Sequence, residues 1–282
     1  MIVRPVEPTD FAAIAELQAR YDIRWIGAPE RDDAEMAEAI EQATAAVVIL
    51  EGDAVVAAAW TDPPRATLTI DPDVAPRTVL DEILPWLTER RARVEVFSRD
   101  EPLRVALADV GWSHLQSSFD LVRSADGIWL DEPQWPVGVT VTDFSAATPE
   151  QVHQLIYADA GWAEVPGHIA RSFEDWSRIF VSDKDLPEQQ VLAWRDGVLV
   201  GVATGRIFAD GSGWIGQLAV ARSQRRTGLG RALLLEGLRR RVAAGATTVG
   251  LGVQAANAGA IALYTGVGLE VVREWQVYAA QG

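Results

Sequence analysis

The fold is decided by residues 214–241, WIGQLAVARSQRRTGLGRALLLEGLRRR. Trp214 to Val220 have the apolar character of a buried strand, and the run after Gly230 has that of a helix. Between them lies a loop with two arginines and two glycines, Gly228 and Gly230. A glycine loop between a strand and a helix N-terminus presents backbone N–H groups and a positive partial charge, which together bind phosphate. We therefore predict a phosphate-binding loop after Val220.

The context of these glycines carries the prediction, because Gly-x-Gly alone is a weak signal. Three other such pairs occur, at 211/213, 250/252 and 266/268, and none has arginines before it and a helix pattern after it. Two other known phosphate loops fit poorly. There is no Gly-Lys-Ser/Thr, and Leu233 stands where a dinucleotide fingerprint needs a third small residue.

With these residues the segment resembles the Gcn5-related N-acetyltransferase (GNAT) superfamily, whose signature is Gln/Arg-x-x-Gly-x-Gly/Ala. Arg225, Gly228 and Gly230 occupy those positions. About thirty residues further on, 249–253 reads as a strand, 257–264 as the family's next helix and 268–272 as the turn into its final strands. The resemblance is specific for residues 190–280, and the chain is similar to the tandem-domain, mycothiol-synthase-like acetyltransferases.

The resemblance implies an α/β (α+β) fold of two tandem GNAT-type domains. Each would be a mixed, mostly antiparallel twisted sheet flanked by helices and splayed at the cofactor strand. It also implies acetyl-CoA as the acetyl donor, without a metal. The expected cofactor contacts are the backbone of Leu218, Ala219 and Val220, the side chain of Asn257, and the loop residues Arg225, Arg226, Thr227, Gly228, Leu229, Gly230, Arg231 and Ala232. Asn257 has a plainer alternative as a helix N-cap.

The second half of the chain repeats the pattern of the first. The difference in residue number between matching positions grows smoothly along the chain. Residues 45–60 and 191–203 each read as strand, turn and strand, and Gly111-Trp112 parallels Gly268-Leu269. We predict a degenerate GNAT-like domain over 1–124, a linker over 125–138 and an acetyl-CoA-binding domain over 139–282. In the first copy the loop at 71–76 is DPDVAP, with no glycine and two acids, so a phosphate would be repelled there.

Catalysis of acetyl transfer needs a proton donor for the thiolate and a route for the proton of the amine. By resemblance Tyr264, seven residues after Asn257, is the general acid. Many relatives carry a glutamate on the strand before the phosphate loop, whereas here that strand has Gln217 and no carboxylate. Glu164 and His168, in the region that covers the acceptor in the family, are the candidate replacements, and a water chain is the alternative.

Composition limits the partners. The chain of 282 residues has a net charge of −15 and no cysteine. The charge argues against nucleic acid or an anionic membrane as a main partner, and the absence of cysteine excludes disulfides and thiolate metal sites. Arginines are nevertheless concentrated at 222–241. Arg239 to Arg241 have two possible functions there, phosphate binding or compensation of the helix dipole.

The resulting hypothesis is a cytoplasmic enzyme, monomeric or homodimeric, that N-acetylates a primary amine of a small molecule. Two alternatives stay open. The first is a catalytically weak or inactive CoA-binding sensor or scaffold, which the missing strand carboxylate favours. The second is an aminoacyl or other acyl transferase, against which the intact acetyl-CoA loop argues. The net charge predicts that the protein binds neither nucleic acid nor a membrane.

Overall fold

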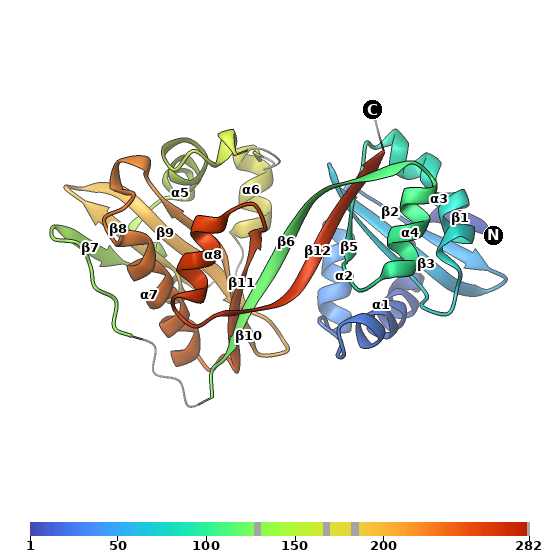
Figure 1. Cartoon of the computed structure of the whole chain (residues 1–282), viewed down its shortest axis with the longest axis horizontal. Helices are drawn as coiled ribbons and strands as arrows, with labels where there is room; N and C mark the ends of the chain where they lie inside the picture. The colour runs from blue at the N-terminus through green and yellow to red at the C-terminus, as the bar shows by residue number, and fades with distance from the viewer. Residues whose placement is uncertain (127–130, 166–169, 182–185, 281–282) are drawn as a thin grey trace. The chain divides into compact units, whose positions relative to one another are not determined.

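The computed structural model describes residues 1–126, 131–165, 170–181 and 186–280 (Figure 1). The chain divides into two compact units. Unit 1 comprises residues 1–119 together with the end of the chain from Arg273, and unit 2 comprises residues 120–272. No helix in the described part of the chain has the length and apolar character needed to cross a membrane.

Unit 1 is built on a mixed sheet in the strand order β1-β2-β3-β4-β5-β12. Neighbouring strands are antiparallel except β4 and β5, which are parallel. The strands are β1 (Ile2–Pro5), β2 (Ala45–Glu51), β3 (Ala54–Asp62), β4 (Arg65–Ile70), β5 (Arg93–Phe97) and the last part of β12 (Glu270–Ala280). The first part of β6 (Trp112–Ser124) also lies in this unit.

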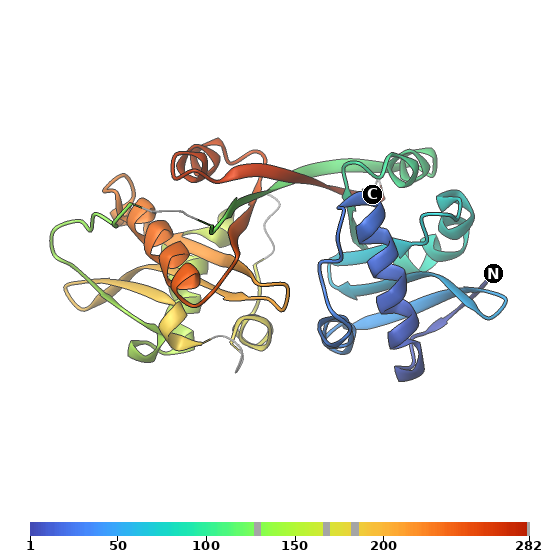
Figure 2. The same ribbon diagram turned by 90° about the horizontal axis from the view of Figure 1, so that it is seen from below.

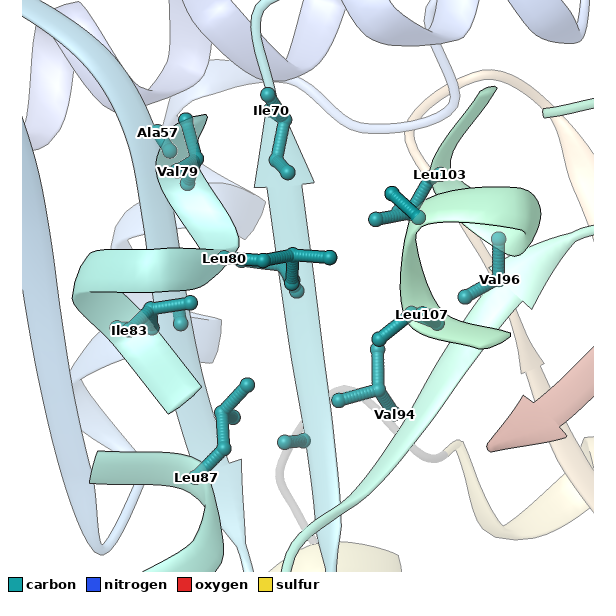
Figure 3. Close-up of a cluster of buried hydrophobic side chains, with 14 of the residues drawn as sticks. Ala57, Ile70, Val79, Leu80, Ile83, Leu87, Val94, Val96, Leu103 and Leu107 are labelled. Atoms are coloured by element: carbon teal, nitrogen blue, oxygen red, sulfur yellow. The ribbon is translucent and has the colours of Figure 1, made fainter. Parts of the chain in front are cut away.

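Helices cover both faces of this sheet. The helices α1 (Phe11–Trp25) and α2 (Asp33–Glu41) lie on one face (Figure 2). They pack on β2 and β3 through a cluster that includes Leu17, Met36 and Val48. On the other face, α3 (Pro76–Glu89) and α4 (Glu101–Asp109) direct Leu80, Ile83, Leu87, Leu103 and Leu107 against β4 and β5 (Figure 3). Burial of these leucines and isoleucines, at about 2 kcal/mol each, makes this the core of unit 1.

Unit 2 repeats the plan in the strand order β6-β11-β10-β9-β8-β7. Its strands are β7 (Val139–Thr142), β8 (Val191–Arg195), β9 (Val198–Ile207), β10 (Ser212–Val220), β11 (Thr248–Gln254) and the end of β6. Its α-helices are α5 (Pro149–Gln154), α6 (Phe173–Phe180), α7 (Leu229–Ala243) and α8 (Ala258–Thr265). A Cβ at Gly250 of β11 would lie 2.7 Å from the Leu121 carbonyl oxygen, so glycine is needed where β6 passes beside it.

Each unit contains a pair of neighbouring parallel strands that separate from one another. In unit 2, β10 and β11 pair from Ser212–Thr248 to Ile215–Leu251, although both strands continue. In unit 1, β4 and β5 pair only as far as Thr67–Glu95. The mixed, mostly antiparallel sheets flanked by helices, with a splay in each, confirm the predicted fold class.

The division of the chain differs from the predicted domain boundaries at two places. The predicted linker 125–138 does precede β7, which begins at Val139, but residues 120–124 at the end of β6 belong to unit 2 rather than to the first domain. Residues from Arg273 onward belong to unit 1, because Trp275 to Tyr278 of β12 pair with β5. A strand pattern does not specify its partner, so this exchange of terminal strands was not visible in the sequence.

Candidate active site

The predicted phosphate loop lies between β10 and α7. After β10 a 3-10 turn, Arg222–Gln224, leads into Arg226 with φ of 63° and Gly228 with φ of 90°. Gly228 is the residue before α7, and its carbonyl accepts the Ala232 N–H at 3.1 Å. The backbone N–H groups of residues 226–231 have no hydrogen-bond partner in the described part of the chain. The first turn of α7 therefore offers its N–H groups and the positive end of its dipole to an anion.

The geometry explains why glycine occupies position 228. Its φ lies in the left-handed region, which costs an L-residue about 1–2 kcal/mol. A Cβ there would meet no atom within 4 Å, so the space in front of the loop is open. Gly230 faces inward instead, where a Cβ would touch Val220 at 3.7 Å and Leu263 at 3.8 Å. Gly228 thus serves the turn, whereas the contacts at position 230 are ordinary van der Waals distances that would accommodate a Cβ.

The arginines of the loop differ in whether they form hydrogen bonds or ion pairs with the rest of the protein. Arg225 donates from Nη2 to the Ala160 carbonyl at 2.7 Å, and Arg231 contacts Asp131 at 3.0 Å and the Gly266 carbonyl at 3.1 Å. Arg226 is exposed and forms no hydrogen bond or ion pair with any described residue. Among the arginines at 225, 226 and 231, Arg226 is therefore the one without a partner among the described residues.

The arginines at the far end of α7 serve the protein instead. Arg240 pairs with Glu236 at 2.8 Å and donates to the Gln190 carbonyl at 2.6 Å. Arg241 is fully buried and donates from Nε to the Trp214 carbonyl at 2.9 Å. These contacts favour a structural function for both over the phosphate binding that the sequence left open.

Arg241 holds an irregularity in β10. The register with β9 shifts between Ile215 and Gln217, which leaves Gly216 as the extra residue of a β-bulge. Opposite the bulge, Gly205 has φ of 151°, and a Cβ on it would collide with the Trp214 carbonyl. Bulges change the face to which a side chain points. Here the change turns Gln217 toward α6.

The backbone expected to polarise the thioester lies just beyond the bulge. Leu218, Ala219 and Val220 pair with β9 on one edge, and on their other edge β10 has already separated from β11. The splay therefore leaves main-chain groups of β10 available to a ligand, as the resemblance implied. Their contact with a cofactor stays a prediction.

Tyr264 is near the C-terminus of α8 and is 8% exposed. Burial raises the pKa of its phenol to about 12. Its hydroxyl has no hydrogen bond to any described residue. The described residues also do not enclose the hydroxyl completely. The hydroxyl is therefore protonated at neutral pH and accessible, as a proton donor must be.

Asn257 caps α8. Its Oδ1 accepts the Ala260 N–H at 3.2 Å, which is the plainer of the two functions expected for it. The cap uses the side-chain oxygen, so the amide nitrogen of this exposed side chain takes no part in it. A contact with the pantetheine arm stays a prediction.

The two candidate bases have different outcomes. Glu164 ends the 3-10 turn Trp162–Glu164, its side chain is 70% exposed and it pairs with Arg222 at 2.6 Å. The hydrogen bond from Arg222 lowers the pKa of Glu164, so its carboxylate is a weak base near neutral pH. His168 lies outside the described residues.

Aromatic residues form the wall opposite β10, and the sequence analysis did not single them out as a cluster. His153 of α5 lies 4.6 Å, centroid to centroid, from Tyr157 and 5.5 Å from Trp176, and its Nε2 is 3.0 Å from the Arg171 carbonyl. Trp176 of α6 is 1% exposed and donates from Nε1 to Gln217 Oε1 at 3.2 Å. The spacing of His153 and Tyr157, four residues apart on one helical face, was the available signal.

Possible metal ligands among the described residues are His, Asp and Glu side chains. The described residues contain no group of three or more His, Asp or Glu side chains placed to hold an ion.

Comparison with known proteins places these features in a family. The model of the acetyltransferase (GNAT) family matches residues 150–269. A mycothiol acetyltransferase of Frankia casuarinae is 30% identical over 222 residues, which are 72% of this chain and 64% of that protein. One from Thermobispora bispora is 27% identical over 79% of each chain.

Solved structures agree on the fold. A GCN5-related N-acetyltransferase from Sphaerobacter thermophilus superposes with a TM-score of 0.81 at 22% identity, covering 98% of this chain and 94% of that one. A tandem GNAT protein from the clavulanic acid biosynthesis pathway gives 0.75 at 16% identity, covering 99% and 98%. Because the family model matches the phosphate loop and its flanking strands, residues 150–269 form a domain of the acetyltransferase (GNAT) family, a family of acyltransferases.

Proposed function

We propose that unit 2 transfers an acetyl group from acetyl-CoA to a primary amine of a small molecule. The observation that carries the proposal is the open N–H cradle at residues 226–231, which faces free space and adjoins the splayed edge of β10. A pyrophosphate would bind there to backbone N–H groups and Arg226, and the splay would receive the pantetheine arm. Relatives named mycothiol acetyltransferase support acetyl transfer as the reaction.

Two of the three steps have a candidate group in the chain, and water would serve the third. Main-chain N–H groups of β10 would stabilise the oxygen of the thioester as it becomes anionic. Tyr264 would protonate the leaving thiolate. The acceptor amine would lose its proton to water, since Glu164 is ion-paired with a lowered pKa and β10 carries no carboxylate.

The first test is a measurement of CoA release by the full chain over a panel of small primary amines, with calorimetric titration of acetyl-CoA. We expect release that depends on the amine and one binding site per chain. One site is expected because the equivalent loop of unit 1 uses its own carboxylate: Asp71 accepts the Asp73 N–H at 3.0 Å and pairs with Arg20 at 2.8 Å. Two sites would contradict the inactivity of unit 1.

A CoA-binding sensor or scaffold is the second candidate. The absence of a carboxylate on β10 and the ion pair of Glu164 favour it. Tight acetyl-CoA binding without CoA release from any amine would support this function and refute acetyl transfer.

A further inference from the structure

Gln217 is a buried polar side chain that the bulge directs to the face of β10 covered by α6. We call this face, where we expect the acceptor to bind, the acceptor side. Before the bulge, Ile215 faces α7, since a Cβ on Gly237 would lie 2.8 Å from its Cδ1. Regular alternation would direct Gln217 to that same face. The extra residue, Gly216, reverses the alternation, and Gln217 contacts Trp176 of α6 instead.

Hydrogen bonds fix the orientation of the Gln217 amide. The indole Nε1–H of Trp176 can only donate, so the atom that it contacts at 3.2 Å must be the amide oxygen. The Thr204 hydroxyl approaches the same oxygen at 3.4 Å. With Oε1 occupied by these two donors, the amide nitrogen and its two hydrogens point away from Trp176.

The Gln217 amide nitrogen, Nε2, has no hydrogen-bond acceptor among the described residues. Gln217 is 3% exposed, and the described residues do not enclose Nε2 completely. A buried donor of this kind costs free energy unless a ligand or water accepts from it.

We propose that Gln217 is a positioning residue that donates an Nε2–H hydrogen bond to a carbonyl oxygen of the acceptor substrate. The inference rests on the proposed acetyl transfer and narrows its acceptor to primary amines with a carbonyl close to the amino group. Where other members of the family use a carboxylate to take a proton, this chain presents a neutral donor that binds the substrate.

The position of Gln217, next to the backbone that is expected to face the thioester, favours a carbonyl close to the amine. Gln217 directly precedes Leu218, whose backbone is expected to face the thioester, and consecutive Cα atoms are about 3.8 Å apart. The attacking nitrogen must approach the thioester carbon to about 3–3.5 Å. An α-amino amide, whose carbonyl is adjacent to the carbon that bears the amine, is therefore the acceptor chosen for the test.

The test compares glycinamide with ethylamine, which lacks the carbonyl, in a CoA-release assay referred to the concentration of neutral amine. We expect wild-type kcat/KM to favour glycinamide by about tenfold or more, because a site built to donate a hydrogen bond discriminates against a ligand without the acceptor. In Gln217→Glu the carboxylate still accepts from Trp176 and Thr204 but donates nothing. The ratio between the two amines should then fall to about one, with the KM for acetyl-CoA unchanged.

Trp176→Phe gives a second measurement that does not depend on the folding of the Glu variant. It removes the N–H that orients the amide, so the preference for glycinamide should decrease while ethylamine turnover changes less. Retention of the full preference in both variants would overturn the proposal, as would a wild-type enzyme that acetylates both amines equally. No CoA release from any amine would instead refute the acetyl transfer itself.

Discussion

Gly228→Asp tests the phosphate loop most directly. In the free protein the substitution meets no atom within 4 Å of the new Cβ, so its structural cost is the left-handed backbone at φ of 90°, about 1–2 kcal/mol. In the complex, a carboxylate about 5 Å from one phosphate charge costs about 3 kcal/mol at an effective dielectric constant of about 20. That is roughly a hundredfold loss of acetyl-CoA affinity from the charge alone.

Two control variants separate the causes. Gly228→Asn has nearly the same size and tolerates the left-handed conformation, but adds no charge, so the difference between Asp and Asn measures the electrostatic repulsion. Gly245→Asp places the same side chain at the other end of α7, where φ is 98° and a Cβ also meets nothing within 4 Å. It should have the same backbone cost without loss of affinity.

The assay is calorimetric titration with acetyl-CoA, with thermal unfolding of each variant measured in parallel. We expect the Asp variant at position 228 to bind at least roughly a hundredfold more weakly than wild type, and the Gly245 variant to bind normally. Equal affinity of wild type, Gly228→Asn and Gly228→Asp would refute the placement of the pyrophosphate at this loop.

Three further predictions concern single side chains. Tyr264→Phe should lower kcat about ten- to a thousandfold with little change in acetyl-CoA affinity; because burial raises the Tyr264 pKa to about 12, the ratio to wild type should be constant between pH 6 and about 10, and unchanged kcat would exclude the hydroxyl as the acid. Glu164→Gln should leave unchanged a kcat/KM profile that rises with pH as the amine becomes neutral, whereas a selective loss at low pH would identify Glu164 as the base. Burial raises the pKa of Asp22 in unit 1 from 3.8 to about 6, so the folded protein binds this proton more tightly and loses about 3 kcal/mol of stability as pH rises from about 4 to above 6; urea unfolding of Asp22→Asn should lack this decrease, and an identical pH dependence would contradict it.

The sequence predicted the local architecture of the loop well, because the signals there are local. Left-handed backbone at Gly228 and the free N–H groups of the helix start both follow from residues that are adjacent in the chain. The acidic loop at 71–76 was equally recognisable, and the Asp71 carboxylate does accept the Asp73 N–H, one of the groups that a phosphate would need.

The partners of the charged residues were not predictable. Arg225 appeared to be a phosphate ligand and donates to the carbonyl of Ala160, which is 65 residues away. Glu164 appeared to be a possible base and is neutralised by Arg222. Each charge is obvious in the sequence, but its pKa and its availability depend on which distant group the fold places beside it.

The sequence by itself determined that the chain contains two copies of one fold and that one copy retains the phosphate loop, since both follow from patterns of neighbouring residues. Only the tertiary structure decided that β12 completes the sheet of unit 1 and that a bulge held by Arg241 turns Gln217 toward Trp176. A strand pattern specifies an extended backbone with two faces. The strand that pairs with it, and the face that a residue takes after a bulge, are set by hydrogen bonds between segments far apart in the chain.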